Sequence, residues 1–384
     1  MDAIKAVHQN IKPSEDLLVL LNEFRKMVND CIRIGLDENI TSTKSLSLKA
    51  YHQLERYKVP TYYRLTAISK AVGILRNYRK KLQKHPNAKK PYASKLMLTD
   101  CYSFKIVNNQ LRLSLSLGDK KFIFIPLNNY VLRSISGYNV RSVTLTAFTL
   151  SIAFSKETAQ TDITGLIGLD RNLDSLTTAT LDGIIERFDL SGATKAKTLY
   201  SEVKSHFRRN DVRVARKVQR KYGKKQRDKV QPILHIVSKR IVTQAKAEHF
   251  GIVMENLKGI RKLYRRGNGQ GREFRSRLNS WGFFELQRQI EYKAHWEGIL
   301  VIYVHPAKTS STCAVCGCEV SECAERKVYC PRCVRIVDRD ENAAVRIVWA
   351  GVRFAPKGEA GEAVKGNPVK AILGADASQL TIPR

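Results

Sequence analysis

Apolar residues recur at helical spacing in the first 90 residues of the chain. The segment PSEDLLVLLNEFRKMVNDCIRIGL begins at Pro13, with Ser14 placed to cap a helix and Gly35 placed to end it. A second stretch with helical spacing extends from about residue 62 to residue 82. These patterns predict a helical segment over residues 13–90.

The pattern changes to short alternation between residues 97 and 154. Apolar and polar residues alternate in the segments SFKIVN, QLRLSLSL, KKFIFIPL, RSVTLTAF and TLSIAF, which are separated by turn residues. Alternation with a period of two is typical of strands with one buried face. Several short strands in succession predict a small antiparallel barrel or sandwich.

A buried strand and a hairpin open the next part of the chain, after Glu157. The apolar segment ITGLIGLD, residues 163–170, is typical of a core strand in a parallel sheet. The two segments that follow, LTTATLDG and IIERFDL, meet at the turn Asp182-Gly183 and predict a hairpin. Three strands in this order, followed by helices, are how an RNase H-like fold begins.

Helices and two further strands continue this part of the chain. A basic helical region over residues 195–250 precedes the short buried segment GIVMENL. A basic loop interrupted by glycines is predicted over residues 258–277, and a helix over residues 279–298 leads into the strand ILVIYVH. The tail, residues 353–384, has little periodicity, so we expect it to be disordered.

The charge of the chain points to a polyanionic partner. The 384 residues include 67 lysines and arginines against 35 aspartates and glutamates, which gives a formal net charge of +32. Such an excess, spread over most of the chain, is typical of proteins that bind nucleic acid. No segment approaches the roughly 18 apolar residues of a membrane-spanning helix, and the N-terminal segment lacks the apolar core of a signal peptide. We therefore expect a protein that binds nucleic acid in the cytosol or the nucleus, without a membrane partner.

Six of the eight cysteines lie between residues 313 and 333. Two pairs, Cys313 with Cys316 and Cys330 with Cys333, form the pattern C-x2-C-x13-C-x2-C. Two such pairs can supply four thiolates to a tetrahedral zinc site. Clustered cysteines of this kind are typical of metal binding in a reducing compartment rather than of disulfides.

Three acidic residues follow buried strands or the cysteine pattern. Asp170 ends the first core strand, Glu255 ends the segment GIVME, and Asp340 follows the last cysteine pair. Each acid has an ordinary alternative, because an acid at a strand end is often a turn or capping residue; Asp340 could cap a helix starting near Asn342. Since 85 residues separate each acid from the next, only the fold could bring them together.

Four segments, in this order, resemble the motifs of the TnpB family: GLIGLDRNLDSLTTATLDG, GIVMENLKGI, HPAKTSSTCAVCG and YCPRCVRIVDRDENAAVRI. TnpB proteins are transposon-encoded RNA-guided nucleases related to type V CRISPR effectors. The resemblance is strong from Ile163 to Ala350 and weak in the N-terminal segment KAVHQNIKPSED. It implies an α/β fold with additional β structure. The expected RNase H-like (RuvC-like) nuclease domain contains an inserted zinc ribbon, and a small β-barrel (wedge) domain with a helical insert precedes it.

The resemblance also implies domain bounds. We expect the wedge domain over residues 1–12 and 91–157, the helical recognition insert over 13–90, the RuvC-like domain over 158–305 and 337–352, and the zinc ribbon over 306–336.

The resemblance further implies the site residues and cofactors. The catalytic acids of the family, which bind Mg²⁺, fall on Asp170, Glu255 and Asp340. Its ligands for a structural Zn²⁺ fall on Cys313, Cys316, Cys330 and Cys333. Between Asp338 and Asp340, the acid before x-N-A-A is the ligand in the family. Two Mg²⁺ ions about 4 Å apart would activate a water molecule and stabilise the leaving 3′ oxygen of a phosphodiester.

The chain departs from the family pattern at two positions. A glycine is usual two residues after the first acid, where this chain has Asn172. Asparagine tolerates the left-handed conformation better than most residues, so we expect the turn to be kept. Asp174 stands where a basic or neutral residue is common, and it adds negative charge near the expected metal site.

Basic residues on the predicted helices and loops are candidates for contacts with phosphates. A single run of charges is more often a solvated helix face, but here the excess recurs in every segment. The candidate nucleic-acid-binding residues are Arg76, Arg79, Lys80, Lys81, Arg208, Arg209, Arg213, Arg216, Lys217, Arg220, Lys221, Lys224, Lys225, Arg265 and Arg266.

The resemblance implies an RNA-guided DNA endonuclease associated with a transposon. Its expected partners are one guide RNA per protein and a double-stranded DNA target beside a short flanking motif, in the prokaryotic cytoplasm with the nucleoid. Two alternatives stay open: an RNA-guided DNA-binding repressor without nuclease activity, and a compact type V CRISPR effector. A zinc-ribbon accessory protein would leave the acids at two strand ends unexplained. A tyrosine transposase would need a His-x-His site, which is absent from the sequence.

Overall fold

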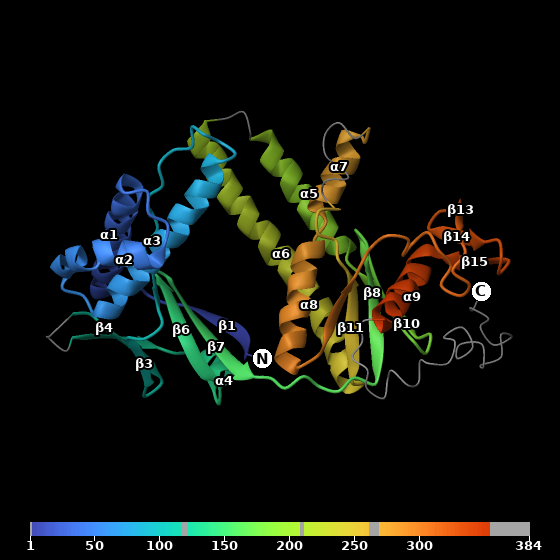
Figure 1. Ribbon diagram of the computed structural model, residues 1–384, viewed down its shortest axis with the longest axis horizontal. Helices are drawn as coiled ribbons and strands as arrows, with labels where there is room; N and C mark the ends of the chain where they lie inside the picture. Colours follow the sequence, from blue (N-terminus) through green and yellow to red (C-terminus); the bar gives the residue numbers. More distant parts are fainter. Residues whose placement is uncertain (1, 117–120, 208–210, 261–268, 354–384) are drawn as a thin grey trace. The chain divides into compact units, whose positions relative to one another are not determined.

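The chain folds into two compact units, which divide after Glu157. The computed structural model describes residues 2–116, 121–207, 211–260 and 269–353 (Figure 1). The first unit comprises Asp2–Glu157, and the second begins at Thr158. Among the described residues, none of the helices is both long enough and apolar enough to cross a membrane.

The first unit combines a helical segment with two antiparallel sheets. Ser14 caps the first long helix, as predicted, because its hydroxyl accepts a hydrogen bond from the amide of Leu17 at 3.2 Å. One sheet has the strand order β1-β7-β6-β2 and the other the order β3-β4-β5. The elements are β1 (Asp2–Asn10), α1 (Glu15–Asp37), α2 (Thr43–Ala50), the 3-10 helix η1 (His52–Tyr57), α3 (Thr61–Leu82), β2 (Met97–Asp100), β3 (Phe104–Val107), β4 (Gln110–Ser114), β5 (Phe122–Pro126), α4 (Asn129–Ile135), β6 (Asn139–Thr146) and β7 (Thr149–Glu157).

The second unit is built on a mixed five-stranded sheet of order β10-β9-β8-β11-β12. Strands β10, β9 and β8 pair antiparallel, whereas β8, β11 and β12 are parallel. The elements are β8 (Gly165–Arg171), β9 (Ser175–Thr180), β10 (Ile185–Asp189), α5 (Ser191–His206), α6 (Val212–Ala247), β11 (Phe250–Glu255), α7 (Arg272–Ser280), α8 (Phe283–Glu297), β12 (Val301–Val304), β13 (Ser321–Ala324), β14 (Lys327–Cys330), β15 (Arg335–Asp338) and α9 (Arg339–Val352).

Helices cover both faces of this sheet, which explains why its central strands are apolar throughout. On one face, Ile167 and Leu169 of β8 belong to a buried cluster with residues of α6 and α8. On the other face, Leu166 and Val253 belong to a cluster with Ala344 and other residues of α9. Because side chains alternate along a strand, each residue near the end of β8 or β11 faces either α9 or the α6 and α8 layer.

Three predictions differ from the structure. Helix α1 does not end at Gly35 but continues to Asp37. The loop expected over residues 258–277 contains the start of helix α7, which begins at Arg272. The glycines before Arg272 end at Gly271, and the sequence after it has no residue that prevents a helix. The single helical region expected over residues 195–250 consists of two helices, α5 and α6, with residues 208–210 outside the described part. The expected disordered tail also lies outside the described residues, except for Arg353.

We predict that Gly168→Ala destabilises the second unit by about 1–3 kcal/mol, because overpacking a close contact forces the two elements apart. A Cβ atom at Gly168 would lie 2.5 Å from the carbonyl oxygen of Ala344 and 2.8 Å from the amide nitrogen of Val348, both in the backbone of α9. Thermal unfolding of the metal-free protein would measure the loss. The matched control is Gly223→Ala in helix α6, where no atom lies within 4 Å and alanine should be neutral or slightly stabilising. Equal unfolding temperatures for both variants would contradict the prediction.

Candidate active site

The three acids predicted from the sequence lie at one edge of the five-stranded sheet. Asp170 and Glu255 stand at the carboxyl ends of the neighbouring parallel strands β8 and β11, where the residues before them, Leu169 and Met254, are partners in the register. Asp340 lies in the first turn of α9. All three side chains line one cleft of about 570 Å³. The fold therefore brings together acids that are 85 residues apart in sequence.

Burial and mutual repulsion make this carboxylate cluster unfavourable without a cation. Asp170 is 9% exposed, Glu255 8% and Asp340 1%. Burial, followed by the charges of Glu255 and Asp340, raises the pKa of Asp170 from 3.8 to about 7. Burial also raises the pKa of Glu255, although its hydrogen bond from Thr309 and the charge of Arg171 oppose the shift. Clustered carboxylate oxygens of this kind are suitable ligands for Mg²⁺.

The neighbouring acids Asp338 and Asp340 have separate roles in the structure. Asp338 caps helix α9, since its carboxylate accepts hydrogen bonds from the amides of Asp340 and Glu341 at 2.9 and 3.2 Å. It also forms an ion pair with Arg187 at 2.8 Å. The alternative that Asp340 caps a helix starting near Asn342 is wrong, because α9 already begins at Arg339. Asp340 is thereby left to face the cleft.

Arg326 connects the cysteine-rich segment to Asp340. Its guanidinium donates to Oδ2 of Asp340 through Nε at 3.1 Å and through a second, shorter hydrogen bond. Arg326 lies in the turn between β13 and β14, with a left-handed backbone (φ 56°). The placement of this acid thus depends partly on how the cysteine-rich segment folds.

The two departures from the family pattern are accommodated locally. Asn172 does not adopt the expected left-handed conformation; instead, its side-chain amide donates a hydrogen bond to Oδ2 of Asp170 at 2.7 Å. Asp174 does not line the cleft, and its carboxylate lies 3.8 Å from the guanidinium of Arg277. The additional negative charge is therefore paired outside the cleft.

Sequence reasoning missed several residues that contact the acids. The hydroxyl of Thr309 donates to Oε1 of Glu255 at 2.6 Å, and Arg187 lies 4.0 Å from Asp340. Thr309 lies in HPAKTSSTCAVCG, one of the segments that resemble the family motifs, but nothing in its sequence position indicates a contact with Glu255. Arg171 gave a signal, because it is a cation at the end of an apolar strand that is buried throughout.

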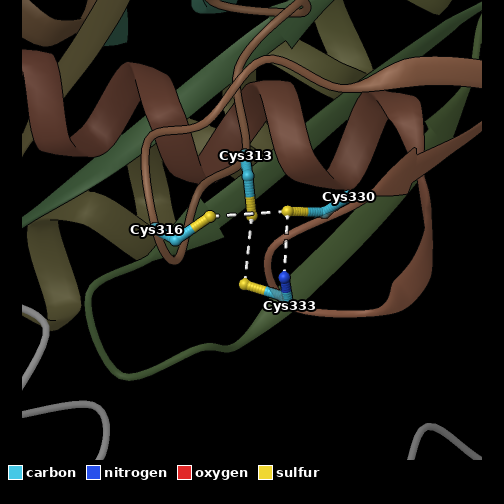
Figure 2. Close-up of side chains that lie close together, drawn as sticks. All are labelled: Cys313, Cys316, Cys330 and Cys333. Atoms are coloured by element: carbon cyan, nitrogen blue, oxygen red, sulfur yellow. Dashed lines mark hydrogen bonds between the residues drawn. The ribbon is translucent and has the colours of Figure 1, made fainter.

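The four predicted cysteine ligands converge at a second site (Figure 2). Their sulfur atoms all lie within 4.8 Å of one another; two pairs, Cys313 with Cys333 and Cys316 with Cys330, are 3.9 and 3.4 Å apart. A Zn–S bond of about 2.3 Å in a tetrahedron requires sulfur atoms about 3.8 Å apart. The cluster could hold a metal ion, and its dimensions are suitable for zinc. Cys318 and Cys323 are outside the cluster.

The candidate nucleic-acid-binding residues occupy several surfaces. Seven are exposed on the first half of α6: Arg213, Arg216, Lys217, Arg220, Lys221, Lys224 and Lys225. In the first unit, Arg76 and Arg79 are exposed on α3 but bond to the loop before α2, through Thr41 and Asn39. Lys80 and Lys81 are exposed on the last turn of α3. Arg208, Arg209, Arg265 and Arg266 lie outside the described residues.

Comparison with known proteins shows similarity to TnpB-like and Cas12f-like proteins. The model for the Cas12f1-like TNB domain matches residues 283–347. The TnpB-like protein MJ0751 of Methanocaldococcus jannaschii is 40% identical over 120 residues, which are 31% of this chain and 42% of that protein. The chain is therefore similar, over part of its length, to a TnpB-like protein and to the Cas12f1-like TNB domain.

Cas12f proteins are also similar to this chain. The CRISPR-associated endodeoxyribonuclease Cas12f2 of a Micrarchaeota archaeon is 33% identical over 135 residues, which are 32% of this chain and 24% of that protein. The alignments with Cas12f2 and with MJ0751 each span less than half of the length of the relative. Cas12f1 in a cryo-EM complex with sgRNA and target DNA has a similar fold, with a TM-score of 0.57 and 16% identity over 87% of this chain and 83% of that chain.

The first prediction from these sites concerns zinc. Protein prepared without chelators should contain one zinc ion per chain, and Cys330→Ser should lose it and lower the unfolding temperature of the second unit, because three thiolates leave the tetrahedral site incomplete. Elemental analysis and thermal unfolding would measure both effects. The control Cys323→Ser changes an exposed thiol outside the cluster and should keep the zinc. Zinc-free unmutated protein would contradict the prediction.

The second prediction concerns pH. The pKa of Asp170 is about 7 in the folded protein, above its unfolded value, so this group favours folding at low pH and loses that contribution as the pH rises through 7. A cation bound to the Asp170 carboxylate would oppose this loss of stability. Below pH 7 the cation must first displace the proton from Asp170. Mg²⁺ should therefore raise the unfolding temperature more at pH 8 than at pH 6.

Thermal unfolding with and without Mg²⁺, at both pH values and without nucleic acid, would measure this difference. Asp170→Asn cannot ionise, so its response to Mg²⁺ should be small and should not depend on pH in this range. A response of the unmutated protein that is equal at pH 6 and pH 8 would contradict the assignment of the shift to Asp170.

Proposed function

We propose that the chain is an RNA-guided DNA endonuclease that hydrolyses the phosphodiester bonds of target DNA at Asp170, Glu255 and Asp340. The observation that carries the proposal is the convergence of these three buried acids in one cleft. The strand order, with three antiparallel strands followed by two parallel ones, supports an RNase H-like, RuvC-like nuclease domain. The similarity to Cas12f2, a CRISPR-associated endodeoxyribonuclease, supports DNA cleavage.

The acids and their neighbours would prepare the cleft for magnesium. Asp170, Glu255 and Asp340 offer carboxylate oxygens, and Thr309 and Asn172 each hold one of these oxygens by a hydrogen bond. Magnesium bound there would activate water and neutralise charge on the scissile phosphate. The clustered cysteines would hold a structural zinc, and Arg326, on the turn between β13 and β14, would hold Asp340 in place from that side.

Basic surfaces would bind the guide RNA and the target. Seven exposed lysines and arginines make the first half of α6 strongly basic. Lys221 and Lys225 also lie close to the ring of Tyr222. Such a helix is suited to sugar-phosphate backbones, whose binding weakens steeply with salt. Base pairing with the guide would supply target sequence, next to a short flanking motif that the protein reads.

The remaining parts of the proposal follow from the family. The first unit would contain the wedge domain and its helical insert, one protein would bind one guide RNA, and the gene would be associated with a transposon. A compact type V effector is the related alternative, with the same site and chemistry. A repressor without cleavage is less well supported, because all three acids are present and share one cleft.

We predict that replacing Asp170, Glu255 or Asp340 with alanine lowers the rate of DNA cleavage by more than roughly 1,000-fold, because each carboxylate is needed to hold the metal. Binding of RNA and target should be nearly unchanged. The measurement uses the RNA that copurifies with the protein, a matching duplex with a library of flanking sequences, and Mg²⁺ against EDTA.

Asp338→Ala is the matched control for Asp340→Ala, since it removes an acid two residues away that caps α9 and does not line the cleft. It should keep much more activity. Target binding without any metal-dependent cut in the unmutated protein would favour the repressor, whereas full cutting by Asp170→Ala would show that the active site is elsewhere.

A further inference from the structure

Arg171 is a buried cation beside the three acids, among the residues that line the same cleft. It is the last residue of β8 and is only 2% exposed. Side chains alternate along a strand, so Arg171 points to the opposite face of the sheet from Asp170, toward the layer that contains α8. There its guanidinium contacts α8 through Gln287, whose Oε1 accepts a hydrogen bond at 2.9 Å.

The second contact of Arg171 reaches the end of the neighbouring strand. Its guanidinium donates a short hydrogen bond to the main-chain carbonyl oxygen of Glu255. Glu255 is the last residue of β11, and its own side chain lines the cleft. Arg171 thus connects β8, which carries Asp170, to Glu255 at the end of β11, and it links both strands to α8 through Gln287.

The charge of Arg171 has no direct ion pair among the described residues. Burial lowers the pKa of Arg171, and the charges of Glu255 and Asp170 near the cleft and of Glu291 on α8 oppose this shift. Burying a guanidinium costs several kcal/mol unless such charges compensate it. A leucine would fill an apolar strand end without this cost, which indicates that the hydrogen bonds and charge of Arg171 serve the site.

A short chain of polar contacts supports Arg171 from behind. Gln287 also lies 3.5 Å from Oε1 of Glu291, and the hydroxyl of Tyr303 on β12 donates to the same carboxylate oxygen. These contacts fix the side chain of Gln287 and so fix the direction in which the guanidinium points.

We propose that Arg171 is a positioning residue of the nuclease: by binding the carbonyl oxygen of Glu255 and anchoring it to Gln287, it holds the Glu255 carboxylate beside Asp170 for metal binding. This inference rests on the proposed function. Among the described residues, the hydrogen bonds of the Arg171 guanidinium go to Gln287 and to the main-chain carbonyl of Glu255, so Arg171 acts on the site through the main chain of Glu255. Loss of such a supporting contact typically weakens metal binding or activity by about 10- to 100-fold.

The test measures Mn²⁺ affinity, which does not require cleavage. Titration of zinc-loaded protein, with free Mn²⁺ followed by its electron paramagnetic resonance signal, should show binding that is about 10-fold weaker in Arg171→Met. Arg171→Lys can still donate to the Glu255 carbonyl and should recover part of the affinity. Cleavage by Arg171→Met should also recover when Mn²⁺ is raised in proportion. In the same titration, Asp170→Ala should lose the Mn²⁺ ion that binds at the three acids, and this loss identifies that ion.

Lys246→Met is the matched control, because it removes one positive charge from the far end of α6, where Lys246 pairs with Glu297 at 2.7 Å. It should leave Mn²⁺ affinity unchanged. Unchanged or tighter Mn²⁺ binding in Arg171→Met, or a loss of thermal stability with normal Mn²⁺ affinity, would overturn the proposal. Absence of Mn²⁺ binding at the acids in the unmutated protein would overturn both proposals, whereas Mn²⁺ binding without cleavage would overturn only the nuclease.

Discussion

Electrostatic repulsion among three buried carboxylates is the constraint on which the second unit depends. Asp170, Glu255 and Asp340 are each at least nine-tenths buried, and the pKa of Asp170 rises to about 7 in consequence. A fold that gathers such charges without a permanent cation is less stable than one with apolar residues in their place. The arrangement is understandable if the cleft exists to receive a divalent cation, which would convert repulsion into attraction.

The surrounding structure holds the acids in place from several directions. Thr309 and Asn172 each donate to one carboxylate, Arg326 binds Asp340 from the cysteine-rich segment, and Arg171 binds the main chain of Glu255 from the opposite face. These donors are contributed by segments far apart in the chain. The cleft is therefore a property of the whole second unit, and damage to the cysteine cluster should affect the cleft through Arg326.

Close packing of helix α9 on the sheet is the second requirement. Gly168 has no room for a Cβ, because the backbone of α9 at Ala344 and Val348 lies against it. Two residues later on the same face of β8 stands Asp170. On α9, the small buried residues Ala343 and Ala344 also allow the helix to pack closely on the sheet. A short distance between α9 and β8 thus places Asp340 beside the acids of the strands.

The sequence alone determined most of the elements and the identity of the candidate site residues. Period-two alternation predicted strands in residues 97–154, and apolar runs predicted β8 and β11. Ser14 predicted a helix start, and the paired cysteines predicted a four-thiol cluster. These signals are local, because each depends on residues that are near one another in the sequence. Helix α7 was missed because the basic, glycine-containing segment before it lacks clear periodicity. The division between α5 and α6 was missed because neither glycine nor proline marks it in the sequence.

Only the tertiary structure decided which acids share a cleft and what holds them there. The carboxylate of Asp338 caps a helix while that of Asp340 enters the cleft, although the two are separated by a single residue. Asn172 donates a hydrogen bond to Asp170 and does not form the expected left-handed turn. Arg171, at the end of β8, donates a hydrogen bond to the main chain of Glu255 on the neighbouring strand β11. These contacts join residues brought together by chain folding, and their energies depend on burial and distance, which no local pattern of residues contains.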